Sequence, residues 1–371
     1  MGGASSGTLV GVTSTPRRKP LLFDAFPTLG GSLPWIPLAD TPTGVDSCAP
    51  IAEWLGRREG VAMKRDDLVS TLYGGNKVRR FELVFGEALA QGKKRIVTVG
   101  GIASTQVMAT VLFARSLGLP VRAVLFDQPL TRFAQDSLAG YAAAGAELVY
   151  GGGYAGTFVR ALVAQQRGDG NYFLFPGASG PLANVGYVDA MLELGLQVER
   201  GEAERPDVIV LPTGSSGTVA ALALGVAYLG WDTEVVGVRI TSRAVCNRMM
   251  VERRIHATAR FLRSRDPRFP DLARKARFSL FQDACGQGYG YPTPEAIEGE
   301  DMLEKLTGAR GEVTYSGKAL AGLRAMLAMP RYAKKRFLLW NTLSTPRPSV
   351  EGGRERLPKS LRWAFERPVV A

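Results

Sequence analysis

The chain of 371 residues contains only three cysteines and a single histidine. Cys48, Cys246 and Cys285 are far apart and odd in number, which argues against a disulfide framework and favours a reducing, cytoplasmic environment. No cluster of cysteine and histidine has the spacing of a zinc site, so we expect no metal. A catalytic unit built on histidine would depend on His256, which lies among arginines and which we place on an exposed helix face.

Long apolar runs are missing as well. The sequence has no stretch of about 18 consecutive apolar residues, the length that a membrane-spanning helix needs. We therefore expect no membrane-spanning segment and no membrane partner.

Acidic residues are fewer than basic ones, 34 against 46, which gives a net charge of +12. The basic residues are densest in segments 248–277, 331–336 and 347–367. Such an excess suits nucleic acid, an anionic substrate or a cofactor phosphate. Aromatic residues do not alternate regularly with these charges, as a stacking platform for single strands requires. A solvated basic surface is therefore favoured, and nucleic-acid binding is the weaker hypothesis.

Glycine, in contrast, is abundant, with 44 residues, and short apolar runs alternate with longer periodic segments. This alternation indicates βαβ units and an α/β fold with open, mostly parallel, twisted sheets that carry helices on both faces. We expect strands at 61–66, 96–99, 121–126, 147–150, 172–175, 208–211, 234–240 and 336–340. We expect helices at 104–117, 130–143, 156–166, 184–199 and 218–229, and a basic, mostly helical segment at 244–278.

Lys77 follows Gly74, Gly75 and Asn76 at the expected start of a further helix. The two glycines allow a tight turn that side chains would obstruct. Taken alone, the stretch favours an ordinary exposed lysine, because lysine is mostly found exposed. A lysine held in a pocket would instead have a lowered pKa and could form a Schiff base with an aldehyde.

Two further strand-to-helix junctions are candidate binding sites. The loop at 211–218, which contains Gly214, Ser215, Ser216, Gly217 and Thr218, would expose backbone N–H groups at a helix start and suits a phosphate, although an ordinary turn remains the alternative. The junction at 99–106 places Ser104, Thr105 and Gln106 at the carboxyl end of a strand, where ligands of parallel sheets bind. Ser104 is also typical of a helix N-cap. Tyr289 and Tyr315 lie in glycine-containing turns, where they are either core-edge residues or ligand contacts.

These segments together resemble one family. The sequences GGNKVRR, VGGIASTQ, TGSSGT, GYGYP and TYSGKALAGL occur in the order and spacing of pyridoxal-phosphate enzymes similar to 1-aminocyclopropane-1-carboxylate deaminase and D-cysteine desulfhydrase. Pro176 to Pro181, followed by Gly186 and Tyr187, also resembles the family, and the similarity covers about residues 35–345. The resemblance implies the tryptophan-synthase-β-like fold type II and pyridoxal 5'-phosphate as cofactor.

The resemblance also implies roles for individual residues. Lys77 would hold the cofactor as a Schiff base, and Arg80 would contact its phosphate. The loop residues Gly214, Ser215, Ser216, Gly217 and Thr218 would cradle that phosphate. Ser104 would act as a catalytic relay or substrate contact, Thr105 would face the cofactor ring, and Gln106 would meet the substrate carboxylate. Tyr289 and Tyr315 match the active-site tyrosines of the family.

Ser316 matches the position that faces the pyridine nitrogen, where the deaminases have glutamate and the desulfhydrases threonine. A hydroxyl gives a milder electron sink than a carboxylate. Ser316 therefore favours β-elimination from a small amino acid to a 2-oxo acid and ammonia, whereas Gln106 weakly favours ring opening of the deaminase type.

Three departures from the family keep a second hypothesis open. Thr105 replaces asparagine, Ser216 replaces a glycine in the phosphate loop, and Asn341–Ser344 stand where the family has a His-Thr-Gly-Gly-like turn. These changes suit either a different substrate or a cofactor-binding homologue with little turnover.

The resemblance implies the domain organisation too. We expect a flexible tail over residues 1–30, a larger cofactor-binding domain formed by 31–79 and 190–371, and a smaller α/β domain over 80–189. The family also implies a homodimer.

Overall fold

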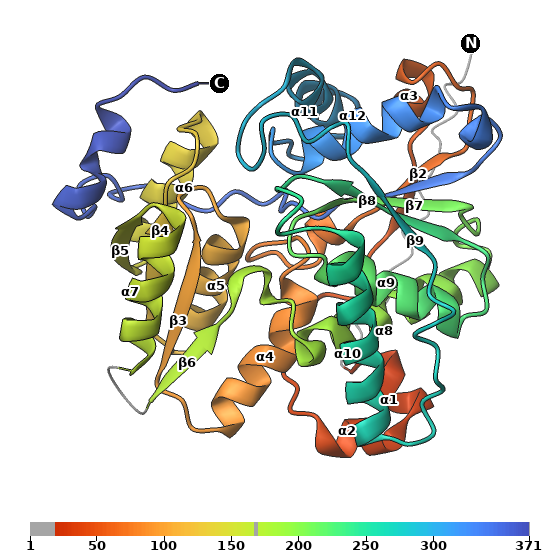
Figure 1. The fold of residues 1–371 in the computed structure, drawn as a ribbon, viewed down its shortest axis with the longest axis horizontal. Coiled ribbons are helices and arrows are strands. Elements are labelled where there is room, and N and C mark those ends of the chain that lie inside the picture. The colour runs from red at the N-terminus through yellow and green to blue at the C-terminus, as the bar shows by residue number, and fades with distance from the viewer. Residues whose placement is uncertain (1–18, 167–169, 371) are drawn as a thin grey trace, which may run out of the picture.

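The structure is a computed structural model that describes residues 19–166 and 170–370. It contains two separate sheets, each covered by its own helices, in two units that lie side by side (Figure 1). The expected α/β fold with two packed units is therefore confirmed. Among the described residues, no helix is both long and apolar enough to cross a bilayer.

The larger sheet has six strands in the order β1-β2-β10-β7-β8-β9. Neighbouring strands are parallel except for the edge pair β1 and β2, which is antiparallel. The strands are β1 (Val45–Ser47), β2 (Val61–Lys64), β10 (Phe337–Trp340), β7 (Val208–Thr213), β8 (Glu234–Arg239) and β9 (Phe278–Phe281).

Alternate residues of these strands enter two different cores. Ile209 and Leu211 pack on one face with α1 (Leu21–Ala25), α2 (Pro27–Ser32), α8 (Pro181–Glu199), α9 (Gly217–Tyr228) and α10 (Arg248–Arg265). Val208 and Val210 pack on the other face with α3 (Ala49–Trp54), α11 (Pro294–Thr307) and α12 (Ser316–Leu327). This is the period of two that a strand buried on both faces imposes.

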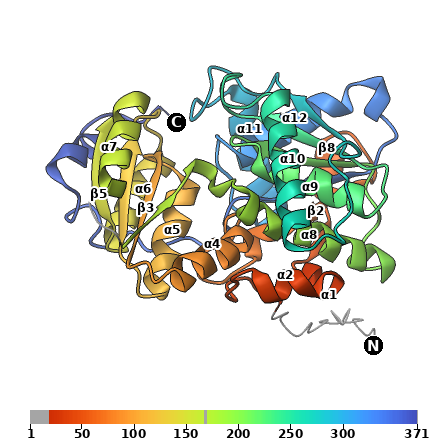
Figure 2. The ribbon, with the colours of Figure 1, turned by 60° about the horizontal axis from the view of Figure 1, so that its bottom comes forward.

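The smaller sheet has four parallel strands in the order β5-β4-β3-β6. They are β5 (Glu147–Gly152), β4 (Val121–Phe126), β3 (Arg95–Gly101) and β6 (Asn171–Leu174). Helices α4 (Val78–Ala90), α5 (Thr105–Ser116) and α6 (Arg132–Ala143) share one core with this sheet, and α7 (Tyr154–Gln166) packs on the opposite face. Figure 2 shows α4 reaching from this unit toward α8 of the larger one.

The expected alternation of strands and helices is present, but the expected tail is wrong for residues 19–30. Helices α1 and α2 lie there, and Leu22, Phe26 and Leu29 are buried in the core of the larger unit. Burial of these apolar side chains outweighs the poor helix signal of a short segment rich in proline and glycine. Residues 1–18 lie outside the described residues.

Two other expectations need correction. The basic segment 244–278 is helical only over α10, and it ends in the edge strand β9. The end of the chain does not belong wholly to the larger unit, because Leu357, Leu361 and Ala364, around the 3₁₀ turn Lys359–Phe365, pack into the core of the smaller one. The remaining domain boundaries stay a prediction. Other short 3₁₀ turns are Asp66–Leu68, Pro176–Ala178 and Pro330–Tyr332.

Candidate active site

A cavity of about 330 Å³ lies where the carboxyl ends of strands from both sheets face each other. Its walls include the end of β3 at Gly100 and Gly101, the end of β7 at Thr213, and Thr241 just beyond β8. Parallel sheets bind their ligands at this edge. The cavity is lined by most of the site residues expected from the sequence, namely Lys77, Ser104, Gln106, Gly214, Ser215, Ser216, Gly217, Thr218, Tyr289 and Tyr315.

The turn before α4 can be made only with glycine at both positions. A Cβ on Gly74 would lie 1.8 Å from the Asp67 carbonyl oxygen. A Cβ on Gly75, whose φ is +88°, would lie 2.5 Å from the Thr342 carbonyl oxygen. These close approaches bring Lys77 to the cavity wall at the N-terminal end of α4.

The amine of Lys77 makes few polar contacts with the described residues. Its Nζ donates a hydrogen bond to Asn76 Oδ1 at 2.7 Å, and Asn76 Nδ2 donates in turn to Thr218 Oγ1 at 3.2 Å. Burial, and secondarily the charge of Arg80, lower the pKa of Lys77 to about 7. An appreciable fraction of the amine is therefore neutral and nucleophilic near neutral pH.

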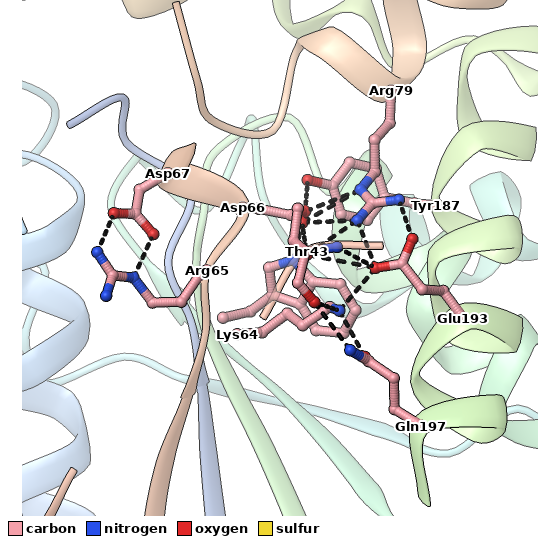
Figure 3. A network of polar contacts seen from close by, with 10 residues as sticks. Thr43, Lys64, Arg65, Asp66, Asp67, Arg79, Tyr187, Glu193 and Gln197 are labelled. Atoms are coloured by element: carbon pink, nitrogen blue, oxygen red, sulfur yellow. Dashed lines mark hydrogen bonds and ion pairs between the residues drawn. The ribbon is translucent and has the colours of Figure 1, made fainter. Parts of the chain in front are cut away.

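A buried ionic network around Arg79 adjoins this turn (Figure 3). The Arg79 guanidinium lies 2.9 Å from both Asp66 and Glu193, and Lys64 Nζ lies 2.7 Å from Glu193. Burial alone would raise the pKa of Glu193, but Arg79 and Lys64 outweigh it and hold this pKa well below its usual range. Asp66 also accepts the Gly75 N–H at its carbonyl oxygen, 2.7 Å away. The network thus fixes the turn that carries Lys77.

The loop at 213–218 forms another part of the cavity wall. Helix α9 begins at Gly217, and no side chain caps its N-terminus, so the N–H groups of its first turn are left for a ligand. A Cβ on Gly217 would lie 2.5 Å from Ser179 Cβ, which allows only glycine at this position. Ser216, the departure from the family pattern, adopts a left-handed φ of +66° and hydrogen-bonds Cys246 Sγ with its hydroxyl at 3.4 Å. The Ser216 hydroxyl is therefore bonded within the protein.

Arg80 lies behind the loop and is not among the residues that line the cavity. Its guanidinium donates to the Ala178 carbonyl oxygen at 2.6 Å and to Thr218 Oγ1 at 2.8 Å. Direct contact of Arg80 with a cofactor phosphate stays a prediction, whereas its support of Thr218 is visible. Burial is the main cause that lowers the pKa of Arg80 to about 10, so it keeps its charge at neutral pH.

At the start of α5, Ser104 and Gln106 line the cavity but Thr105 does not. The Ser104 Oγ accepts the Val107 N–H at 3.3 Å, as an N-cap does. The Gln106 amide donates to Thr98 Oγ1 at 3.1 Å and to the Phe175 carbonyl oxygen at 3.2 Å, and it accepts the Gly177 N–H. In this structure Gln106 therefore holds the 175–177 segment in place, and its expected contact with a substrate carboxylate stays a prediction.

Tyr289 and Tyr315 meet at one end of the cavity, with their hydroxyl oxygens 3.0 Å apart. Burial raises the pKa of Tyr289 to about 12 and that of Tyr315 well above its ordinary value. Both phenols therefore keep their protons at neutral pH. The buried Lys318 amine fixes the Tyr289 loop, because it donates to the Cys285 and Gly288 carbonyl oxygens at 2.8 Å each.

Ser316 begins α12 beside Tyr315 but does not line the cavity. Its hydroxyl accepts the Glu312 N–H at 2.8 Å and donates to the Glu312 carbonyl oxygen at 3.1 Å. The expected contact with a ring nitrogen stays a prediction, and it requires this hydroxyl to leave its backbone partner.

The turn at 341–344 supports the Lys77 turn rather than lining the cavity. Thr342 accepts the Asn76 N–H at its carbonyl oxygen, 3.1 Å away, and Ser344 Oγ accepts the Gly74 N–H at 2.8 Å. Leu343 is buried. This departure from the family pattern thus acts through the position of Lys77.

The sequence analysis did not identify several residues that line the cavity as site residues. Asn76 lies directly before the lysine, and Thr241 and Ser242 follow the end of β8, where the rule for strand ends in parallel sheets could have found them. Asp127, beyond the end of β4, and Gln287 also line the cavity. Gln287 had no such signal, since it lies in an irregular loop.

The cavity offers what a phosphorylated aldehyde needs. The uncapped helix start at Gly217 suits the phosphate, and the glycine there cannot be replaced without displacing Ser179. The Lys77 amine, with its lowered pKa, lies in the same cavity and suits the aldehyde. The residues present therefore fit pyridoxal 5'-phosphate.

Comparison with known proteins agrees with this geometry. The structure is similar to one described as an ACC deaminase homologue, with a TM-score of 0.70, 25% identity, and coverage of 91% of this chain and 98% of that one. It also shares its fold with a threonine deaminase from T.th., with a TM-score of 0.58, 20% identity, and coverage of 88% and 98%. The family described as "Pyridoxal-phosphate dependent enzyme" matches residues 36–342, and the chain therefore belongs to this family of fold type II enzymes.

Proposed function

We propose that this enzyme is a lyase or deaminase that converts a small amino acid to a 2-oxo acid and ammonia by β-elimination. The observation that carries the proposal is the arrangement of Lys77, with its lowered pKa, in one cavity with the uncapped start of α9. The cavity of about 330 Å³ is at the lower end of the range for ligand pockets. Shared with a cofactor, it leaves room only for a small substrate.

Pyridoxal phosphate, when bound, supplies an aldehyde for a covalent bond to an amine and a ring that stabilises negative charge at the substrate Cα. The chain supplies the proton transfers. With the cofactor bound, the Lys77 amine would serve as the general base for the substrate Cα proton, since its pKa of about 7 leaves part of it neutral.

The substrate carboxylate is assigned to the start of α5. The backbone N–H groups of a helix N-terminus favour an anion, and Ser104 lines the cavity there. Since the Ser104 Oγ accepts a hydrogen bond from Val107, its own proton can be donated to a carboxylate oxygen. The Gln106 amide, which lines the cavity and is bonded to the protein in this structure, remains a second candidate contact for that carboxylate.

The two tyrosines are the proton donors for the departing group. Each keeps its proton at neutral pH, and their hydroxyls are hydrogen-bonded to each other at the cavity wall. A proton given by one can be replaced from the other, so the pair can assist a leaving thiol or hydroxyl.

Ring opening of the 1-aminocyclopropane-1-carboxylate deaminase type is the second candidate. The similarity to the ACC deaminase homologue favours it. Against it stands Ser316, because a hydroxyl there supports a milder electron sink than a carboxylate would.

A panel of D- and L-amino acids, including D-cysteine and 1-aminocyclopropane-1-carboxylate, assayed for 2-oxo acid, tests the proposal with Lys77→Ala as control. Release from an amino acid with a β-leaving group supports elimination. Release from the cyclopropane alone supports the second candidate. A substrate-dependent spectral change without 2-oxo acid would identify a binding protein with little turnover.

A further inference from the structure

A second cavity, of about 150 Å³, lies between the two units and shares no lining residue with the active-site cavity. Helix α6 contributes Phe133 and Ser137, Tyr73 comes from the segment before the Gly74–Lys77 turn, and Arg310 follows α11. Arg347, from the segment that returns along the surface, completes the polar part of the wall.

Arg310, like Arg239, is a buried arginine whose side chain has no hydrogen-bond or ion-pair partner among the described residues. Only 8% of Arg310 is exposed, and its guanidinium lies over the Phe133 ring at 4.7 Å. Over the described ranges 19–166 and 170–370, no oxygen accepts a hydrogen bond from this guanidinium and no carboxylate lies within ion-pair distance of it. Buried arginines are normally paired, as Arg79 is with Asp66 and Glu193.

The acidic residues near Arg310 form no ion pair with its guanidinium. The Glu312 carboxylate accepts the N–H groups of residues 314–316. Glu304 pairs with Arg347 at 2.8 Å on the surface. Asp136 lies on the cavity wall, is exposed, and forms no ion pair with Arg310. Asp136 and Glu312 attract the Arg310 charge only from a distance, so its guanidinium has no direct ion pair among the described residues.

We propose that this cavity binds a small oxyanion, a carboxylate or phosphate group, through Arg310. Because Phe133 covers one face of the guanidinium, the N–H groups in its plane remain to bind two oxygens of a ligand. The volume of about 150 Å³ admits a small anion and excludes a nucleotide. Arg347 and the hydroxyls of Tyr73 and Ser137 lie on the same wall.

The position of the site couples it to the active site. Tyr73 directly precedes the Gly74–Lys77 turn, and Arg310 lies two residues before Glu312, which holds the Tyr315 N–H. A bound anion would tie both segments to α6 of the smaller unit. Its occupancy is therefore expected to change substrate affinity as well as stability.

Calorimetric titration of the holoenzyme with inorganic phosphate, at constant ionic strength set with chloride, tests the proposal. Wild-type protein is expected to bind one phosphate with a Kd on the order of millimolar. Arg310→Met should weaken binding by about tenfold or more, and Arg310→Lys should retain part of it. Arg324→Met is the matched control, because Arg324 also lies over an aromatic ring but is exposed and paired with Glu298.

Ser137→Asp gives a second test that keeps Arg310, since the new carboxylate occupies the anion position and should abolish phosphate binding. Failure of the wild-type protein to bind phosphate would overturn the proposal. So would binding that persists unchanged in Arg310→Met or in Ser137→Asp, because the anion would then be bound elsewhere. These outcomes do not depend on whether the enzyme catalyses β-elimination.

Discussion

On one side of the Gly74–Lys77 turn lies the ionic network, in which Lys64, Asp66, Arg79 and Glu193 are all buried and all paired. On the other side lies the cavity, where Lys77 has Asn76 as its hydrogen-bond partner and the start of α9 has no side-chain cap. Each charge of the network has an ion-pair partner within the protein, whereas the Lys77 amine has a single amide oxygen as its partner among the described residues. The network therefore positions the turn, whereas the cavity side carries the groups that are available to a ligand.

Removing the amine on the cavity side should have the largest effect on activity. Lys77→Ala is expected to lower turnover by about three orders of magnitude or more, because it removes both the covalent anchor and the base. Stability should change little, since Asn76 is the one hydrogen-bond partner that the described residues offer the amine. Steady-state kinetics and thermal unfolding measure the two effects. Turnover close to that of the wild type would remove Lys77 from the mechanism.

Breaking the network should instead have its main effect on stability. Arg79→Met removes the ion-pair partner of the buried Asp66 and leaves Glu193 with Lys64 alone, and it is expected to cost about 3–5 kcal/mol of unfolding free energy. Arg324→Met, which breaks an exposed pair with Glu298, should cost about 1 kcal/mol or less. Chemical denaturation compares them, and equal costs would contradict the role given to the network.

The phosphate cradle offers a smaller, local test. Gly217→Ala places a Cβ against Ser179 and should weaken cofactor binding by about tenfold to a hundredfold, as an overpacked site costs about 1–3 kcal/mol. Gly180→Ala is the matched control, since its Cβ would meet nothing within 4 Å. Cofactor titration of the apoprotein measures both variants. Equal affinity in the two would show that the phosphate lies elsewhere.

The pH dependence of cofactor attachment should show the smallest effect. Only the neutral amine reacts with an aldehyde, and the pKa of Lys77 is lowered to about 7. The rate of reconstitution of the apoprotein should therefore rise as pH increases through about 7 and level off above it. A rate that keeps rising toward the ordinary lysine pKa near 10 would show that the amine is solvated.

The alternation of strands and helices was predictable because parallel strands buried on both faces leave uninterrupted apolar runs, such as 208–211. Lys77 and the loop at 213–218 were found through the glycines beside them in the sequence. The hydrogen bonds of Gln106 and Ser316 were not predictable, because their partners Phe175 and Glu312 depend on how separate segments pack. Helices α1 and α2 were missed for a similar reason, since only burial against α8 and α10 stabilises such short helices.

The central claim is that Lys77, and no other lysine, bonds covalently to the cofactor. Borohydride reduction of the purified holoenzyme, followed by peptide mass spectrometry, tests it directly. A pyridoxyl adduct on Lys77 is the predicted result. No adduct, or an adduct on another lysine such as the buried Lys318, would contradict the account.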